Sequence, residues 1–488
     1  MSEFVPVIGL EIHAELKTQS KMFCTCPNGY ELPKEPNRNI CPICLAQPGT
    51  LPTINEQAVK WTILVGLALN CQIARKTKFD RKNYFYPDLP KGYQISQYDQ
   101  PLCMGGFLDI SGRKIRITRI HLEEDTGSLV HPDGAEYSLV NLNRAGVPLM
   151  ELVTEPDIAS GKEAREFAEE LQAIFKYLEI SDADMEKGLM RVEVNISVSD
   201  SHKLGTKVEI KNLNSFKVVE KAVDFEIKRQ ADLLSGGEKI VQETRGWNDK
   251  KEITFSQREK EEAHDYRYFP EPDLLAMNFT SDYIEKIKTE IPELPEQKRA
   301  RFKKEYGMDG DPAEFFVANK DLSEYFEEVV SEFEEWTQED DNHKKASKLA
   351  ANYLISDVQG LLAGKEFSAQ SGPASGWKIT AENFAEFIKM IYKNEISSKV
   401  AKMVLLEMFN TGGDPSSIVE ENNWGQMSDN GELEKIIKEI ISKNPKAVAD
   451  YHAGKQNSLQ FLAGQVMAVT RGTAKPERAQ ELLKKLLD

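Results

Sequence analysis

Short apolar runs broken by Gly, Pro, Asn and Asp fill roughly the first 290 residues. The β-type runs are residues 116–122, 137–142, 191–198 and 206–212. The last two alternate apolar and polar residues, which is typical of half-buried strands. Apolar residues at helical spacing predict a helix over 160–178, and a second one over 216–234 ends at a Ser-Gly-Gly stop signal. This part of the chain therefore predicts mixed strands and helices.

The pattern changes after the Pro-rich stretch at 291–297 and stays mostly helical to the end. Residues 321–341 contain ten acidic residues and neither Lys nor Arg. Their aromatic residues, Tyr325, Phe326, Phe333 and Trp336, are spaced for the buried face of an otherwise solvated helix. A second break lies at 411–415. The predicted fold class is α+β, a mixed region followed by helices.

Composition limits the class of protein. A chain of 488 residues is long enough for about two to four domains, and 40% hydrophobic content excludes a wholly disordered chain. The formal net charge of -17 excludes a uniformly basic nucleic-acid coat but allows a local basic face. The first residues show no basic stretch followed by an apolar one, so we expect no secretory signal, and the apolar run at 61–71 is too short to span a bilayer. We expect a cytoplasmic protein without a membrane partner.

Four of the six cysteines form two close pairs. Cys24 and Cys26 are followed, after fourteen residues, by Cys41 and Cys44. In a reducing compartment such pairs are typical of a tetrahedral Zn²⁺ site, and four thiolates leave no open position for catalysis. The alternative is four unliganded thiols. The spacing thus favours a structural zinc site.

Acidic residues recur on predicted strands. Glu11 and His13 share one strand face, which can hold a hard cation or can simply be a solvated edge. Further carboxylates stand at Glu123, Glu124, Glu193 and Glu209. Oxygens collected from several strands are the usual way to build a Mg²⁺ and phosphate site. Three cations could offset phosphate charge: Arg191, Lys207 and Lys211.

The chain lacks the motifs of several common enzymes. It has no Walker motif, no Gly-x-Ser-x-Gly and no His-Glu-x-x-His. This excludes a familiar P-loop ATPase, serine hydrolase or zincin. The residues alone are consistent with a metal-using multidomain enzyme and allow phosphate chemistry.

Several long strings identify a family. The chain resembles the B subunits of the aspartyl/glutamyl-tRNA amidotransferases over essentially its whole length. The strings that carry the resemblance are residues 79–88, 92–101, 121–125, 140–144, 155–157, 211–216 and 265–273. The related archaeal-type E subunits carry a large extra domain between their N-terminal mixed α and β domain, called the cradle, and their helical region. This chain passes from 273 to its helical part without room for one, so the B subunit is favoured.

The resemblance implies an activity. In the family, an amidase-type A subunit releases ammonia from glutamine, and a small C subunit completes a heterotrimer. The B subunit uses ATP and Mg²⁺ to phosphorylate the side-chain carboxylate of mischarged Glu-tRNA(Gln) or Asp-tRNA(Asn), and ammonia then displaces the phosphate. The resemblance places the catalytic residues at Glu11, His13 and Glu124. It places the Mg²⁺ ligands at Glu11, His13, Glu124, Glu193 and Glu209, with Glu123 as a neighbour. Relatives commonly carry Asp at the Glu193 position, and the four cysteines match zinc-bearing members.

The resemblance also implies three domains. A cradle would occupy residues 1–292, a helical domain 293–408, and a YqeY-like tail that contacts tRNA 409–488. Residues 441–488 carry eight Lys or Arg against four Asp or Glu, which suits phosphate contact but also fits a slightly basic helical bundle. The phosphate candidates are Lys443, Lys446, Lys455, Arg471, Lys475 and Arg478. Besides the B subunit and the E subunit, a third hypothesis is that the chain is a catalytically silent scaffold that binds tRNA.

Overall fold

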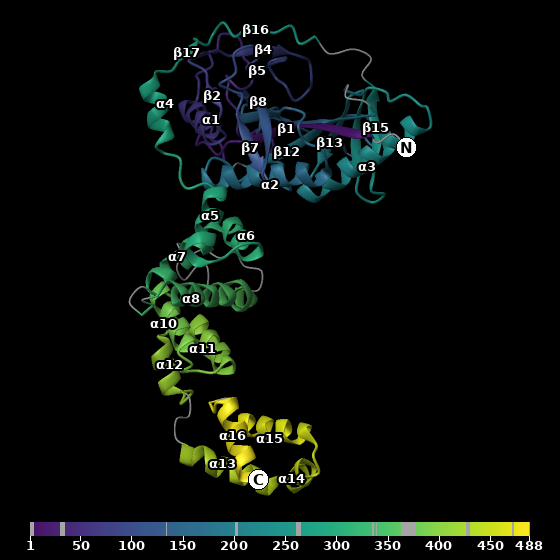
Figure 1. The fold of residues 1–488 in the computed structure, drawn as a ribbon. Coiled ribbons are helices and arrows are strands. Elements are labelled where there is room, and N and C mark those ends of the chain that lie inside the picture. Colours follow the sequence, from purple (N-terminus) through teal and green to yellow (C-terminus); the bar gives the residue numbers. More distant parts are fainter. Residues whose placement is uncertain are drawn as a thin grey trace. The chain divides into compact units, whose positions relative to one another are not determined.

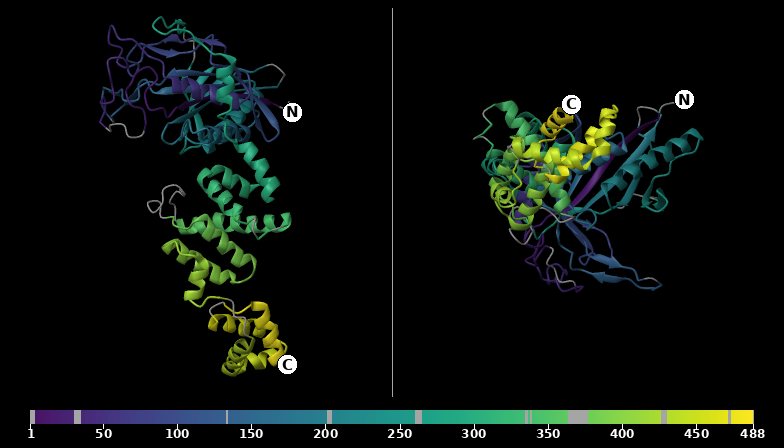
Figure 2. Two further views of the ribbon diagram at one scale, coloured as in Figure 1. Left: turned by 90° about the vertical axis from the view of Figure 1, so that its left-hand side faces the viewer. Right: turned by 90° about the horizontal axis from the view of Figure 1, so that it is seen from below.

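The computed structural model describes residues 4–29, 35–132, 134–200, 204–259, 265–333, 336–337, 339–362, 377–425, 430–470 and 473–487. The chain divides into two compact units, Met1–Pro295 and Glu296–Asp488. The described strands all lie in the first unit, and the second is built from helices (Figure 1). In the two views of Figure 2 the first unit runs from purple to teal and the second from green to yellow. The expected fold class, a mixed α and β region followed by helices, is confirmed.

One large sheet organises the first unit. Its strands are β1 (Val5–Glu15), β2 (Gln72–Ile73), β6 (Cys103–Met104), β7 (Phe107–Ile110), β8 (Arg113–Glu124), β11 (Pro148–Thr154), β12 (Met190–Ser199), β13 (Val208–Leu213), β14 (Glu243–Asn248) and β15 (Ile253–Glu259). They follow the order β15-β14-β13-β12-β1-β11-β8-β6-β2, and β7 also pairs with β8. The pairs are antiparallel except for β13 and β14, which run parallel.

One face of this sheet forms the apolar core. Alternation along β1 buries Ile8, Leu10 and Ile12, which are at most 1% exposed. The helices α1 (Glu56–Ala68), α2 (Gly161–Tyr177) and α3 (Phe216–Ser235) contribute to the same core. Figure 1 shows α2 and α3 running along one side of the sheet. The sheet therefore has one side covered by helices and another on which polar side chains collect.

Local signals explain where these helices begin. Ser160 caps α2 by accepting a hydrogen bond from the Glu163 amide, and Glu163 accepts one from the Ala159 amide. Ser215 caps α3 in the same way. The helices predicted over 160–178 and 216–234 are therefore confirmed. The strand predictions over 116–122, 191–198 and 206–212 are confirmed in β8, β12 and β13, whereas 137–142 forms only a three-residue strand.

Short strands lie beside the main sheet. They are β3 (Lys76–Thr77), β4 (Asp80–Asn83), β5 (Tyr93–Ser96), β9 (Ser128–Val130), β10 (Leu139–Asn141), β16 (Phe269–Pro270) and β17 (Met277–Asn278). They form a three-stranded sheet β16-β4-β5 and the pairs β10-β9 and β17-β3. The chain thus returns after residue 268 to pair with strands near residue 80, and α4 (Ser281–Lys288) follows.

The second unit contains two separate apolar cores. The first core extends from Phe302 to Val419 and the second from Leu433 to Leu487. The first is built on α5 (Pro295–Tyr306), α6 (Asp311–Ala318), α7 (Lys320–Ser331), α8 (Asp340–Asn352), the π-helical η1 (Tyr353–Val358), α9 (Gln359–Leu362), α10 (Ala381–Tyr392), α11 (Ser398–Thr411) and α12 (Pro415–Glu421). The second is built on α13 (Asn430–Lys443), α14 (Pro445–His452), α15 (Gln456–Val469) and α16 (Pro476–Leu487).

The aromatic residues of the acidic segment 321–341 pack inward as predicted, but the prediction that the segment forms one helix is wrong, because α7 ends at Ser331 and α8 begins at Asp340, which leaves Phe333 and Trp336 outside both helices. Tyr325, Phe326 and Phe333 are buried in the first helical core, and Trp336 packs against it. The boundaries predicted at residues 292 and 408 stay predictions. Within the described part of the chain, every helix is too short or too polar to cross a membrane.

Candidate functional site

Charged side chains from several strands collect on the face of the large sheet opposite its apolar core. In the strand register, His13 lies opposite Glu151 of β11 and Arg191 of β12, and Glu151 lies opposite His121 of β8. Directly opposed residues share one sheet face. Alternation adds Glu11, Glu15, Glu123 and Glu193, and β13 adds Glu209 and Lys211. We call this set the charged face.

The carboxylates of the charged face converge in three overlapping groups. The ligand atoms of Glu11, Glu193 and Glu209 lie within 4.8 Å of one another. The same holds for Glu11, His13 and Glu151, and for His121, Glu123 and Glu151. Mg²⁺ prefers carboxylate oxygens, so the all-oxygen group of Glu11, Glu193 and Glu209 fits that ion best. The longer side chain at position 193 still brings its carboxylate into the group.

The electrostatics of the groups follow from burial and close contact. Burial, Glu151 and Glu193 raise the pKa of Glu11. Burial alone would lower the pKa of His13, but Glu151, 3.4 Å away, outweighs it and raises that pKa to about 9. Burial would raise the pKa of Glu151, yet the two histidines beside it leave it lowered. In the absence of a metal, His13 is thus a cation that compensates the carboxylates around it.

Replacing His13 with glutamine tests this ion pair in the metal-free protein. Since the pKa of His13 in the folded protein lies above its unfolded value, the pair stabilises the fold fully below pH 6.5 and loses that effect as pH rises through about 9. We expect His13→Gln to lower the free energy of unfolding by about 3 kcal/mol at pH 6 and by much less at pH 10. Urea denaturation in magnesium-free buffer measures both values. His131→Gln, at an exposed histidine, is the control, and equal losses at both pH values would contradict the assignment.

The side chains of Glu123 and Glu124 contact different parts of the first unit. The carboxylate of Glu123 lies 3.9 Å from His13 and accepts a hydrogen bond from Ser96. The carboxylate of Glu124 pairs with Lys91 at 2.5 Å and accepts the amide of Ile95. Adjacent strand residues face opposite sides, so the structure brings Glu123 next to His13 and leaves Glu124 with the segment that leads into β5.

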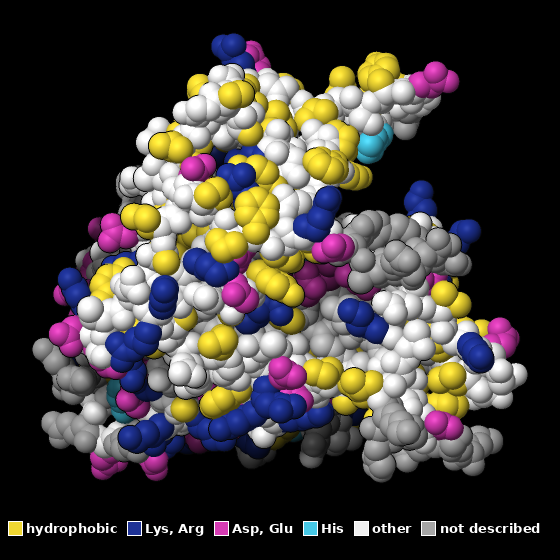
Figure 3. All heavy atoms as spheres, turned by 90° about the horizontal axis from the view of Figure 1, so that it is seen from above, with side chains coloured by type: hydrophobic (Ala, Val, Ile, Leu, Met, Phe, Trp, Pro, Cys, Tyr) yellow, Lys and Arg dark blue, Asp and Glu magenta, His cyan; other side chains and the backbone are white. Residues whose placement is uncertain are grey.

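Basic residues border the carboxylate groups. Lys211 lies 2.7 Å from Glu193 and 3.5 Å from Glu209. Arg191 instead reaches Asp125 at 2.9 Å, and Lys207 is exposed just before β13. On the face drawn in Figure 3, acidic side chains are visible inside a recess between surfaces of mixed hydrophobic and basic side chains. Of the three cations considered for phosphate, Lys211 is thus the one beside the all-oxygen group.

Glu151 and His121 were not identified from the sequence as site residues. Both are buried, at 4% and 3% exposure. Glu151 is the only acidic residue of the apolar run 148–154, and a carboxylate in such a strand must be paired. This single carboxylate in an apolar strand is the signal from which Glu151 could have been identified as a site residue. Lys82 was missed as well, and its pKa is raised, against the effect of burial, by Glu123 and other neighbours.

The four paired cysteines lie together. Their sulfur atoms are within 4.8 Å of one another, and the Cys41 amide donates to the sulfur of Cys44. The pKa of Cys44 is lowered to about 4, first by contact with Cys24 and against the effect of burial. A fully buried lysine, Lys21, lies beside them and donates to the backbone oxygens of Asn39 and Ala145. Four converging sulfurs with a stabilised thiolate fit a tetrahedral zinc site.

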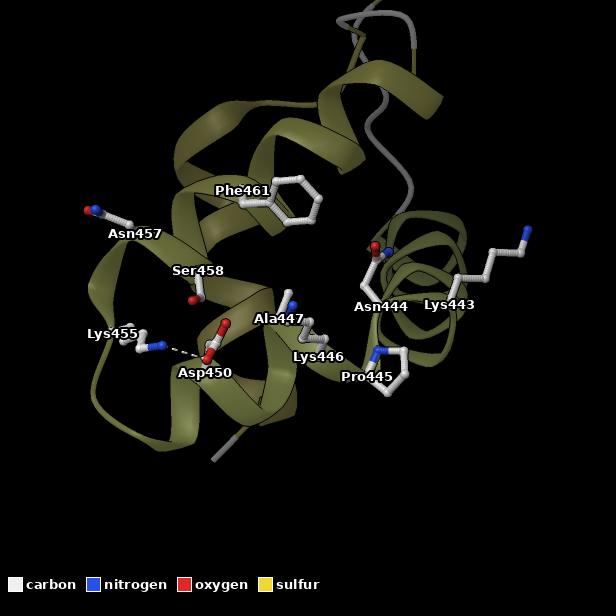
Figure 4. A pocket seen from close by; sticks show the side chains of 10 residues that line it. All are labelled: Lys443, Asn444, Pro445, Lys446, Ala447, Asp450, Lys455, Asn457, Ser458 and Phe461. Atoms are coloured by element: carbon white, nitrogen blue, oxygen red, sulfur yellow. Dashed lines mark hydrogen bonds and ion pairs between the residues drawn. The ribbon is translucent and has the colours of Figure 1, made fainter.

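Part of the predicted basic set lines one cavity in the second unit. The cavity has a volume of about 740 Å³ and lies among α13, α14 and α15. Lys443, Lys446 and Lys455 line it together with Phe461, and Lys455 pairs with Asp450 (Figure 4). Lys475 and Arg478 are exposed at the start of α16, and Arg471 lies outside the described residues.

Comparisons with known proteins agree along the chain. Residues 6–285 match the GatB/GatE catalytic domain, and residues 331–487 match the GatB domain. The chain is 47% identical to an aspartyl/glutamyl-tRNA(Asn/Gln) amidotransferase B subunit from Persephonella marina, covering 99% of this chain and 100% of that protein. It is 47% identical to one from Caldicellulosiruptor bescii, covering 100% and 99%, and 45% identical to one from Brevibacillus brevis, covering 100% of both.

The relatives share one name, and their similarity extends over both units. The catalytic-domain match covers the strands that carry the charged face, and the second match covers most of the helical unit. The chain therefore belongs to the family of aspartyl/glutamyl-tRNA(Asn/Gln) amidotransferase B subunits.

Proposed function

We propose that this chain uses ATP and Mg²⁺ to activate the side-chain carboxylate of Glu-tRNA(Gln), Asp-tRNA(Asn) or both, and then amidates it with ammonia. The observation that carries the proposal is the all-oxygen group of Glu11, Glu193 and Glu209 on the charged face. Ammonia cannot displace an oxygen directly from a carboxylate, because the leaving group would be oxide. Its oxygen becomes a good leaving group once it is phosphorylated, and phosphoryl transfer depends on positioning and charge neutralisation.

Named residues would divide the chemistry. Glu11, Glu193 and Glu209 would hold Mg²⁺, which supplies charge neutralisation for the phosphates when it is bound. Lys211 would bind the transferred phosphoryl oxygens. The substrate carboxylate oxygen forms a bond to the γ-phosphorus and ADP leaves. Ammonia then attacks the acyl carbon, phosphate leaves with that oxygen, and a proton passes from the nitrogen to a base.

His13 is the base we favour for that proton. Its imidazole lies between Glu11 and Glu151, 4.0 and 3.4 Å away, at the centre of the charged face. Both carboxylates stabilise the imidazolium that forms when the proton arrives. Binding of a metal ion beside His13 would favour its neutral form, because the ion would then compensate the carboxylates in place of the imidazolium.

We further propose the assembly and the structural metal. The B subunits among the relatives imply further subunits, and we assign ammonia supply to an amidase-type A subunit, with a small C subunit completing the heterotrimer in the cytoplasm. Cys24, Cys26, Cys41 and Cys44 would hold a structural zinc ion, because a closed set of four sulfurs leaves no position for substrate.

We assign the tail, residues 409–488, to tRNA binding. The cavity is lined by Lys446 and the half-exposed ring of Phe461, together with Lys443, which pairs with Glu439, and Lys455, which pairs with Asp450. Ammonium groups bind phosphates, and an accessible ring offers a surface on which a base can stack.

Lys446→Ala should weaken binding of tRNA to the assembled complex. Removing one ammonium–phosphate interaction lowers the slope of log affinity against log salt by about 1. We expect that change in slope, with a fall in affinity that is largest at low salt and disappears at high salt. Filter binding across a salt series measures it. Lys438→Ala, at an exposed lysine of α13 that pairs with Glu434, is the matched control. An unchanged slope for Lys446→Ala would remove this lysine from the interface.

The proposed activity is tested by reconstitution. The chain is combined with its A and C partners, [γ-³²P]ATP, Mg²⁺ and Glu-tRNA(Gln), without an ammonia source. ATP hydrolysis that depends on mischarged tRNA, followed by Gln-tRNA(Gln) when ammonia is added, is the expected result. Bound tRNA without tRNA-dependent ATP use would favour the scaffold reading instead.

A further inference from the structure

A hydroxyl group contacts one of the three carboxylates of the all-oxygen group. The Thr244 hydroxyl donates a hydrogen bond to Oε2 of Glu209, and the two oxygens are 2.9 Å apart. Both residues are buried, at 7% and 8% exposure. The other carboxylate oxygen, Oε1, lies 3.5 Å from the ammonium group of Lys211. The carboxylate of Glu209 is therefore held at both oxygens, at one by a hydroxyl and at the other by a cation.

The strand register places Thr244 at this carboxylate. Glu209 of β13 lies opposite Thr244 of β14, in the parallel pair of the large sheet. Successive residues of a strand face opposite sides of a sheet, so Glu243 and Arg245 face away from the charged face. Their side chains pair with each other on that other side. Thr244 is thus the residue at this point of β14 whose side chain faces Glu209.

A buried charged network fixes β14 from the other side of the sheet. Its centre is Glu226 of α3, which is fully buried and lies 3.5 Å from the guanidinium group of Arg245. The hydroxyl of Thr254 in β15 donates to Glu226 and accepts a hydrogen bond from Arg245, each at 2.9 Å. A shift of β14 would leave a buried carboxylate without its cation, which is strongly destabilising. The network therefore holds the register that brings Thr244 to Glu209.

We propose that Thr244 is a positioning residue of the Mg²⁺ site, and that its hydroxyl orients the carboxylate of Glu209 toward the other two ligands of the all-oxygen group. The inference rests on the proposed function, because it takes Glu209 as a metal ligand. Mg²⁺ demands near-ideal octahedral geometry, so a ligand that can rotate binds it less well. Without the hydroxyl, the attraction of Lys211 would turn the carboxylate away from the ion. Partners that orient a metal ligand typically contribute about 10- to 100-fold in metal affinity.

Metal binding to the assembled complex tests the proposal without relying on activity. The probe is Mn²⁺, which suits the same oxygen ligands as Mg²⁺, and electron paramagnetic resonance measures the free ion during a titration. We expect Thr244→Val, which keeps the shape but lacks the hydroxyl, to weaken Mn²⁺ binding by about tenfold or more. Thr244→Ser keeps the hydroxyl and should bind Mn²⁺ normally. The matched control is Thr118→Val, which removes a hydroxyl that donates to Glu155 at 2.7 Å at the surface and should leave Mn²⁺ binding unchanged.

A double substitution separates a positioning role from a general effect on the fold. If Thr244 acts through Glu209, Thr244→Val should add nothing to the loss of Mn²⁺ affinity caused by Glu209→Gln. Additive losses would show that the hydroxyl acts elsewhere and would overturn the proposal. Unchanged Mn²⁺ affinity in Thr244→Val, or an equal loss in Thr244→Ser, would overturn it as well. Thr244→Ala removes the same hydroxyl and supplies the comparison if the valine variant does not assemble.

The proposed function and this inference fail in different ways. If the unsubstituted complex binds no Mn²⁺, or if Glu209→Gln binds it normally, the metal site of the proposed function is wrong and the inference fails with it. If Glu209→Gln weakens Mn²⁺ binding but Thr244→Val does not, the metal site stands and the role assigned to Thr244 is wrong.

Discussion

Replacing Glu11 with glutamine is expected to abolish amidation while charged tRNA still binds. Glu11 is the residue shared by the all-oxygen group and the group of His13 and Glu151. Glutamine keeps the shape of the side chain but removes the anion that a hard cation requires. Removal of one preorganised charge interaction at a transition state costs roughly 10²–10³-fold in rate. We expect at least that loss, because both the metal and the base are affected.

Steady-state amidation by the assembled complex, measured across a Mg²⁺ series, gives the result. Glu11→Gln should lower the maximal rate and raise the Mg²⁺ concentration for half-maximal activity. Glu186→Gln, at an exposed position of the same unit, is the control. Normal activity with an unchanged Mg²⁺ requirement would show that the metal lies elsewhere. Comparing Glu123→Gln with Glu124→Gln in the same assay then decides which of the two neighbours serves the site.

Replacing Cys44 with serine is expected to remove bound zinc and to destabilise the first unit. Cys44 is 4% exposed and lies 3.7 Å, sulfur to sulfur, from Cys41. Serine cannot replace a thiolate in a four-sulfur site, and the remaining sulfurs are left buried without their ion. Loss of a structural metal belongs to the changes that exceed the roughly 0.5–3 kcal/mol of ordinary substitutions. We therefore expect the free energy of unfolding to fall by about 3 kcal/mol or more.

Metal analysis measures the loss of zinc, thiol titration measures the exposure of the remaining cysteines, and chemical denaturation measures the loss of stability. The unsubstituted protein should contain one zinc per chain, and Cys44→Ser should contain almost none. The remaining cysteines of the cluster should then react with thiol reagents. Cys71→Ala is the control, because Cys71 is also buried but lies outside the cluster. If zinc is absent from the unsubstituted protein, or is retained in Cys44→Ser, the assignment is wrong.

Local patterns were enough for the secondary structure around the site. Period-two alternation placed Glu11 and His13 on one strand face, and a Ser-Gly-Gly stop signal bounded the end of α3. Pairing between distant strands has no such local signal. Glu151 joins His13 only because β11 lies beside β1, and the choice between Glu123 and Glu124 depends on the register of β8.

The central position of β1 has a consequence for biosynthesis. Glu11 pairs with Val153 on one side and with Glu193 on the other, so both partners are synthesised long after β1 itself. A nascent chain therefore carries β1, with its apolar face, without either neighbour until β11 (Pro148–Thr154) has been translated, and without its second neighbour until nearly 200 residues have been translated. Pairing over such sequence separations is slow, since the entropy cost of closing the loop comes before the stabilisation by pairing. During that interval, chaperones and the ribosome have to keep this strand from aggregating.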